Sequence, residues 1–153
     1  MTEQQTVPAA GVGFTPSDED RRGIEEWFAR YDALSAAGEV ESMADMAVFP
    51  LNVVTSDSAG DGLADQWSRE RFTRTMSEVL GGAGDGGITF ESVRTPHFLT
   101  AELAVVVTEA TMTAGGHTEA MRYADVLVKR GGSWFFQTMI QGGWGDALRQ
   151  SGQ

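Results

Sequence analysis

The spacing of apolar residues changes once along this chain, and this change constrains the fold more than any other feature. In the helices predicted before residue 88, apolar side chains recur every three or four residues, as on one face of a helix. From Ile88 onward they recur every second residue, which is typical of strands. Helices followed by a run of long strands indicate an α+β domain in which N-terminal helices pack on an antiparallel sheet.

The first predicted helix has strong signals at both ends. Its N-terminus is capped either by Thr15, with Pro16 at the first helical position, or by Ser17, with Asp20 three residues later. Gly38 is a natural stop. Between these ends lies one apolar stripe, formed by Ile24, Trp27, Phe28, Tyr31 and Leu34.

The next segments are predicted from shorter signals. A short helix is expected at about 40–47, because Pro50 prevents its continuation. A strand at 51–55 and a Gly/Asp/Ser loop at 56–66 follow. A third helix over about 68–80 is expected to bury Phe72, Met76, Val79 and Leu80.

The second half of the chain predicts a meander of strands. A glycine-rich loop over 81–87 leads into it, and Gly115-Gly116 and Gly131-Gly132 supply the positive φ angles that tight hairpins need. The four expected strands cover 88–95, 102–113, 118–130 and 133–141.

Apolar residues occupy both faces of these strands. Val105 and Val107 face one way while Val106 faces the other, and alternation likewise puts Phe136 opposite Met139. A sheet that is apolar on both faces must be covered on both. The helices can cover one face, so we expect a homodimer through the other. The alternative is that the chain's own termini wrap this outer face.

Charge and composition limit the classes of partner. Eleven Lys+Arg against 22 Asp+Glu give a net charge of −11, which disfavours nucleic acid and anionic membranes as partners. The chain has no cysteine, so thiolate and disulfide chemistry are excluded. No metal, phosphate-loop or dinucleotide motif is present, so we expect no cofactor and no metal. Without a signal peptide in residues 1–14, a cytoplasmic location is expected.

Several segments together resemble the nuclear transport factor 2-like superfamily, which includes ketosteroid isomerase and the SnoaL-like polyketide cyclases. The segments that carry the resemblance are Trp27-Phe-Ala-Arg-Tyr31, Ala36-Ala-Gly-Glu39, Met46-Ala-Val-Phe-Pro50 and Tyr123-Ala-Asp-Val-Leu-Val-Lys-Arg-Gly-Gly-Ser-Trp134. The resemblance implies a cone-shaped α+β barrel on a strongly curved antiparallel sheet, with a small-molecule pocket inside. The domain would span 15–144, between a loose arm at 1–14 and a tail at 145–153.

The resemblance also implies roles for individual residues. On the ketosteroid isomerase pattern, Tyr31 corresponds to the oxyanion-hole tyrosine and Asp125 to the oxyanion-hole acid. Thr55 stands where that enzyme has its proton-shuttling aspartate. Asp57, two residues later, lies on the same face of an extended strand and could replace it as the general base.

Asp125 also attracts attention without the resemblance, because aspartate is disfavoured inside an apolar strand. Burial would raise its pKa and make it a hydrogen-bond donor or general acid near neutral pH. The alternative is a structural ion pair with Arg122 or Arg94. Tyr31 could equally be an ordinary core tyrosine, and Asp57 a solvated loop acid.

The sequence therefore predicts a small-molecule pocket protein, with two interpretations left open. One is a cofactor-independent isomerase, cyclase or dehydratase that acts on a hydrophobic, oxygenated, polyketide- or steroid-like compound. The other is a non-catalytic binding or interaction module of the same fold. Large and adaptable apolar side chains and their neighbours are predicted to form the pocket wall: Trp27, Phe49, Thr55, Trp67, Phe72, Met76, Phe98, Met121, Tyr123 and Met139.

Overall fold

A computed structural model describes residues 13–81 and 89–151 of the chain. Most of the glycine-rich loop predicted at 81–87 therefore lies outside the described residues. The elements are α1 (Asp18–Ala36), α2 (Val40–Ala44), β1 (Ala47–Ser56), β2 (Gly62–Trp67), α3 (Arg69–Gly81), β3 (Thr89–Thr100), β4 (Leu103–Ala114), β5 (His117–Arg130), β6 (Ser133–Ile140) and α4 (Gly145–Ser151).

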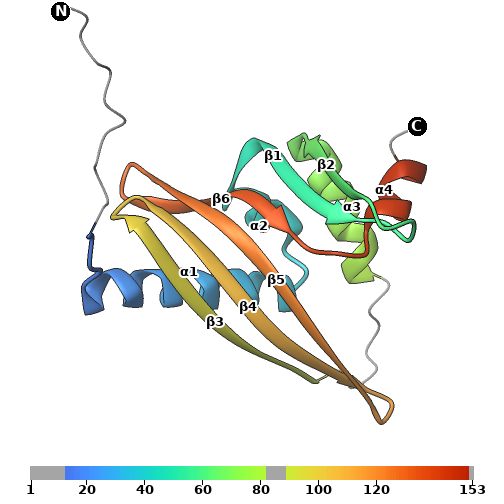
Figure 1. Ribbon diagram of the computed structural model, residues 1–153, viewed down its shortest axis with the longest axis horizontal. Helices are drawn as coiled ribbons and strands as arrows, with labels where there is room; N and C mark the ends of the chain where they lie inside the picture. The colour runs from blue at the N-terminus through green and yellow to red at the C-terminus, as the bar shows by residue number, and fades with distance from the viewer. Residues whose placement is uncertain (1–12, 82–88, 152–153) are drawn as a thin grey trace, which may run out of the picture.

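The strands form one curved six-stranded sheet in the order β2-β1-β6-β5-β4-β3. Neighbouring strands are antiparallel except β1 and β6, which are parallel. Helices α1 to α3 lie on one face, behind the sheet in Figure 1. This confirms the predicted α+β class. The sheet stays open, with β2 and β3 as its edges, so it does not close into a complete barrel.

Helix α1 begins as one of the two predicted caps requires. The Ser17 side chain accepts a hydrogen bond from the Asp20 backbone N–H at 3.0 Å, and the Asp20 carboxylate accepts one from the Ser17 N–H at 2.9 Å. This reciprocal pair is a capping box. The apolar stripe then buries Ile24, Trp27 and Phe28 against the sheet. Helix α1 therefore also holds the other side chains of this stripe, such as Tyr31, against the sheet.

Four predictions about local structure need correction. The loop predicted at 56–66 contains strand β2, which pairs with β1 from Leu51↔Trp67 to Ser56↔Gly62. The short helix ends at Ala44, because the Met46 carbonyl accepts the Phe136 N–H and draws the chain into the sheet. Val79, predicted to be buried, is 42% exposed. Strand β3 continues through Pro96 to Thr100, which is possible because β3 is an edge strand.

A shift in pairing between β5 and β6 changes which side chains face the helices. Val126 pairs with Thr138, but the next residue, Leu127, pairs with Phe136. This bulge breaks the strict alternation. Phe136 and Met139, predicted on opposite faces, consequently line the same cavity.

Helix α4 lies in what was expected to be a tail. Leu148 is 8% exposed and belongs to the hydrophobic core. The Trp144 N–H donates to the Thr55 hydroxyl at 3.0 Å, and the Gly143 N–H donates to the Ser56 hydroxyl at 3.2 Å. The last helix is thus bound to the end of β1 and is part of the domain.

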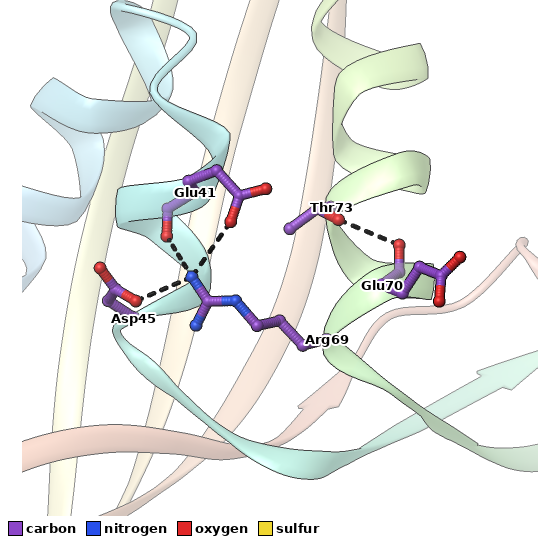
Figure 2. A network of polar contacts seen from close by, with 5 residues as sticks. All are labelled: Glu41, Asp45, Arg69, Glu70 and Thr73. Atoms are coloured by element: carbon purple, nitrogen blue, oxygen red, sulfur yellow. Dashed lines mark hydrogen bonds and ion pairs between the residues drawn. The ribbon is translucent and has the colours of Figure 1, made fainter.

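An arginine at the start of α3 connects this helix to α2 (Figure 2). Arg69 Nη2 contacts the Asp45 carboxylate at 2.8 Å and the Glu41 carboxylate at 3.1 Å, and it donates to the Glu41 carbonyl at 3.0 Å. Within α3, the Thr73 hydroxyl donates to the Glu70 carbonyl. The network fixes the two helices relative to each other on the inner face of the sheet.

The outer face of the sheet carries exposed apolar side chains, including Val93 and Leu103. The homodimer inferred from this two-sided pattern stays a prediction, which size-exclusion chromatography with light scattering tests. In the part of the chain that the structure describes, no helix has the length and apolarity needed to cross a membrane.

Candidate functional site

A small cavity lies between the helices and the inner face of the sheet. Its volume is about 170 Å³. An apolar cavity of about 150 Å³ is large enough for benzene, whereas pockets for drug-sized ligands start at about 300 Å³. The cavity therefore fits a single-ring compound. It is lined by Phe28, Tyr31, Met76, Arg94, Tyr123, Asp125, Phe136, Met139, Ile140 and Gln141.

Asp125 supplies the acid of this cavity. It is 5% exposed and lies in the middle of β5, where the sheet places Val106 directly beside it on β4 and Met139 on β6. These apolar neighbours cannot solvate a carboxylate, and burial raises the pKa of Asp125 to about 7, although the Arg94 charge opposes the shift. Both protonation states are consequently populated near neutral pH.

Tyr31 brings a phenol to the same cavity from α1. Its ring meets Phe136 edge-on, with 4.7 Å between ring centroids. Burial raises the pKa of the Tyr31 hydroxyl well above its ordinary value of 10, and the nearby Asp125 charge adds to the shift. Tyr31 therefore remains protonated and can act only through its O–H group, which can donate a hydrogen bond to a ligand oxygen.

Tyr123 is a second phenol, two residues before Asp125 on the same face of β5. Burial raises the pKa of its hydroxyl, but Arg94 acts in the opposite direction. The two tyrosines thus differ in surroundings, since the hydroxyl of Tyr123 has a cation beside it.

Arg94 enters the cavity from β3 and is held by α1. Its Nη1 and Nη2 bind the two oxygens of Asp32 at 2.6 and 2.9 Å, and its guanidinium carbon lies 4.3 Å from the Phe28 ring centroid. Arg122 pairs with Glu109 at 2.7 Å. Neither arginine forms the ion pair with Asp125 that was the structural alternative, although Arg94 acts on Asp125 through its charge.

Five of the predicted site residues line the cavity: Tyr31, Met76, Tyr123, Asp125 and Met139. The other predicted wall residues do not. Phe72, Trp27 and Trp67 are core residues, and Phe49 and Phe98 pack against that core. Met121 lines a separate, open hollow of about 720 Å³ on β3 to β5, where the charged groups include the paired Glu109 and Arg122.

Asp57 and Thr55, considered for the proton-transfer position, have structural contacts elsewhere. The Asp57 side chain is 0% exposed and forms an ion pair with Arg149 of α4 at 2.6 Å. It also accepts the backbone N–H groups of Ala59 and Asp61 at 3.0 and 2.9 Å. Thr55 accepts the Trp144 N–H. Neither residue lines the cavity, so the predicted general base is not at the site.

The cavity also includes residues that the sequence prediction did not place there, namely Phe28, Arg94, Phe136, Ile140 and Gln141. Phe28 and Tyr31 are three residues apart on one helix, so the apolar stripe of α1 could have indicated Phe28. Arg94 follows the same inward alternation of β3 as Phe98. The bulge that brings Phe136 and Met139 together has no comparable sequence signal.

Comparisons with known proteins support the fold. Neither the protein-family models nor the curated proteins gave a match to the sequence. Among solved structures, a nuclear transport factor 2-like protein of unknown function from Pseudomonas putida is 16% identical, with a TM-score of 0.65, and the match covers 84% of this chain and 89% of that one.

Two further structures carry names. Aln2 from a Streptomyces species is 15% identical, with a TM-score of 0.61 over 90% of this chain and 99% of that one. A protein from Novosphingobium aromaticivorans named "Putative Scytalone Dehydratase" is 19% identical, with a TM-score of 0.56 over 79% of this chain and 81% of that one. At these identities the likeness concerns the fold: this chain has the nuclear transport factor 2-like fold.

Proposed function

We propose that the cavity is an acid–base site acting on a small, hydrophobic, oxygenated ring compound. The observation that carries the proposal is Asp125, which lies in the cavity with a pKa of about 7. An acid–base group works best when its pKa is close to the working pH. Tyr31, as a permanent donor, would stabilise negative charge that develops on a substrate oxygen.

Because Asp57 is bound elsewhere, Asp125 would have to move the proton in both directions. The ionised Asp125 removes a proton from the carbon next to a substrate carbonyl, while the Tyr31 O–H donates to that carbonyl oxygen. The protonated Asp125 then gives the proton to a hydroxyl on the neighbouring carbon. The carbon–oxygen bond breaks, a carbon–carbon double bond forms and water leaves. Isomerisation differs only in that the proton returns to another carbon.

Dehydration is the variant we favour, because one structural neighbour carries a dehydratase name. The cavity size supports a smaller substrate than the steroid- or polyketide-like compound predicted from the sequence. A single ring matches the volume of about 170 Å³.

A β-hydroxy ketone with one ring, 3-hydroxycyclohexanone, tests the proposal. Its dehydration and its exchange of carbon-bound hydrogen in D₂O are followed by NMR. The wild-type protein should accelerate both, and Asp125→Asn and Tyr31→Phe should each lower the rate by about 10²- to 10³-fold. Asp65→Asn is the matched control, since Asp65 pairs with Arg71 outside the cavity and its loss should leave the rate unchanged.

One observation favours a second function, a non-catalytic binding module. Among the described residues that line the cavity, Asp125 is the sole carboxylic acid, so no separate base accompanies it. In that case 3-hydroxycyclohexanone would bind, as seen in the NMR shifts of cavity residues, but the wild-type rates of dehydration and exchange would equal those of Asp125→Asn. That result would exclude the enzyme and retain the pocket.

A further inference from the structure

A row of three polar side chains crosses β3, β4 and β5 beside Asp125. Arg94 pairs with Thr108, and Thr108 pairs with Tyr123, so all three project from the same face of the sheet. Arg94 and Tyr123 line the cavity, and Thr108 is fully buried between them. The row lies one inward-facing position along the strands from the row that holds Asp125.

The hydrogen-bonding capacity of this row is not used up by the protein. A guanidinium has five N–H donors. Asp32 occupies one on each Nη atom, and Arg94 also interacts with the Tyr123 hydroxyl as a hydrogen-bond donor. Arg94 Nε and Thr108 Oγ1 are both buried and have no hydrogen-bond partner among the described residues. Buried polar groups without partners are uncommon in folded proteins, so two of them side by side call for an explanation.

The positive charge of Arg94 is screened by solvent less than the negative charge of its partner Asp32. The Arg94 side chain is 17% exposed, whereas the Asp32 side chain is 49% exposed, so solvent screens the carboxylate better than the guanidinium. Asp125 is largely neutral below pH 7. Arg94 lines the cavity, and a guanidinium donor that Asp32 does not occupy can hydrogen-bond an oxygen of a carboxylate there.

We propose that Arg94 and Tyr123, positioned by Thr108, form a second polar subsite that binds a carboxylate of the substrate. This inference rests on the proposed function, because it assigns the substrate of the same cavity to the class of single-ring hydroxy or keto acids. The carbonyl or hydroxyl end meets Asp125 and Tyr31, and the carboxylate meets Arg94. Tyr123 and Asp125 are two residues apart on a strand, roughly 7 Å, which suits the ends of one ring.

A carboxylate at this subsite would also act on Asp125. A negative charge nearby favours the protonated form of an acid, so the pKa of Asp125 should rise further when the carboxylate binds. Binding of the acid should then weaken as the pH rises through that pKa. A ligand without the carboxylate should show a much smaller effect, and this difference separates the subsite from simple packing.

Two probes that differ in the carboxylate test the inference: 4-hydroxybenzoate and phenol. Titration at pH 6, followed by NMR, should show that 4-hydroxybenzoate binds on the order of 10-fold more tightly than phenol. The Arg94 Nε–H signal should shift with 4-hydroxybenzoate and much less with phenol. The Asp125 carboxyl signal should report a higher pKa in the 4-hydroxybenzoate complex.

Arg94→Gln should abolish the preference for 4-hydroxybenzoate. The matched control is Arg71→Gln, because Arg71 is also 17% exposed, pairs with an aspartate at 2.7 Å and contacts an aromatic ring, but lies outside the cavity. The Arg71→Gln variant should still bind 4-hydroxybenzoate more tightly than phenol. Thr108→Val keeps the shape of the side chain and should reduce the preference by roughly two- to fivefold.

The outcomes separate the two proposals. Equal binding of both probes by the wild-type protein would refute the carboxylate subsite and leave the acid–base function standing. Loss of preference in Arg71→Gln as well as in Arg94→Gln would refute the assignment to Arg94. If neither probe binds at millimolar concentration, the subsite is refuted, and the 3-hydroxycyclohexanone assay decides the proposed function separately.

Discussion

Two aspartates of this protein are hidden from solvent, and their surroundings shift their pKa values in opposite directions. Asp125 lies between apolar side chains of a central strand, and burial raises its pKa to about 7. Asp57 lies where β1 ends, and the pKa of its carboxyl is lowered, first by the hydrogen bond from the Asp61 N–H and further by Arg149 and the Ala59 N–H.

The two carboxyls differ in the donors and charges around them and in the depth of their surroundings, because Asp125 lies in the core of the sheet whereas Asp57 lies in a turn near the surface. Asp57 has two backbone N–H donors and a guanidinium within 3.0 Å. No residue in the described parts of the chain donates a hydrogen bond to Asp125 or pairs with it directly. A deeply buried carboxyl without donors can exchange protons near neutral pH, whereas a carboxyl that has two N–H donors and a guanidinium stays an anion that holds structure together.

The largest effect is expected from Asp125→Asn on stability as a function of pH. The unfolded chain releases the Asp125 proton near pH 4, whereas the folded protein holds it to about pH 7, so the free energy of unfolding falls between these values. The Asp125→Asn variant has no carboxyl at this position, so its free energy of unfolding does not fall for this reason. Relative to the wild type, it should therefore gain up to about 4 kcal/mol between pH 4 and pH 8.

Urea unfolding at several pH values measures this difference. Asp65→Asn, which replaces an acid that is paired with Arg71, is the control and should not reproduce the gain. A constant difference between Asp125→Asn and the wild type from pH 4 to pH 8 would mean that the native carboxyl is ionised and compensated, like Asp57. The comparison between the two aspartates would then fail.

The next largest effect concerns the packing around Asp57. A Cβ atom at Gly145 would lie 2.7 Å from Asp57 Cβ and 2.8 Å from the Ser56 carbonyl oxygen. These distances are too short for non-bonded atoms, so the backbone at Ser56 and Asp57 or at residue 145 would have to shift. Gly145→Ala should lower the free energy of unfolding by about 1–3 kcal/mol, the usual cost of overpacking.

Gly142→Ala is the matched control in the same segment. Its Cβ would meet the Ser56 hydroxyl, the end of a small side chain, at 3.1 Å, so the loss in urea unfolding should be smaller than for Gly145→Ala. Equal stabilities of Gly145→Ala and the wild type would show that the segment around Asp57 adapts easily. Rigid positioning of its donors would then not explain the lowered pKa.

The two aspartates also show how far the sequence can predict a site. Asp125 was predicted because an acid in an apolar strand is a local anomaly that the pattern itself displays. The helices, the meander and the inward face of α1 followed from periodicity in the same way, and with them Tyr31. These features depend on neighbours in sequence, or on one face of one element.

The features that the sequence did not predict depend on distant parts of the chain. Asp57 was placed near the site by analogy, but its contacts come from Arg149, 92 residues later, and from a loop whose second half is a strand. Alternation along β3 puts Arg94 on the inward face, but the pairing that holds its guanidinium comes from Asp32 of α1. The bulge opposite Val126 and Leu127 puts Met139 on the same face of the sheet as Phe136, although alternation predicted opposite faces. No local pattern encodes these pairings.

The smallest effect is expected from Asp57→Asn, because its partner Arg149 is 53% exposed and solvent weakens their attraction. The amide oxygen can still accept the N–H groups of Ala59 and Asp61, so the variant loses mainly the charge. A lowered pKa stabilises the fold above the ordinary value of 3.8, and this contribution disappears as the pH falls through the native pKa. The destabilisation should therefore be present at pH 7 and absent in strong acid.

A double-mutant cycle with Arg149→Gln separates this charge effect from the rest of the α4 contact. If the ion pair is the cause, each single variant lowers the midpoint of urea unfolding at pH 7 by a similar amount, and the double variant adds little. Helix α4 should stay in place in all three, since Leu148 remains in the core and Trp144 still donates to Thr55. Additive losses would mean that Asp57 is stabilised by its backbone donors alone. The contrast with Asp125 would then rest on hydrogen bonds and not on charge.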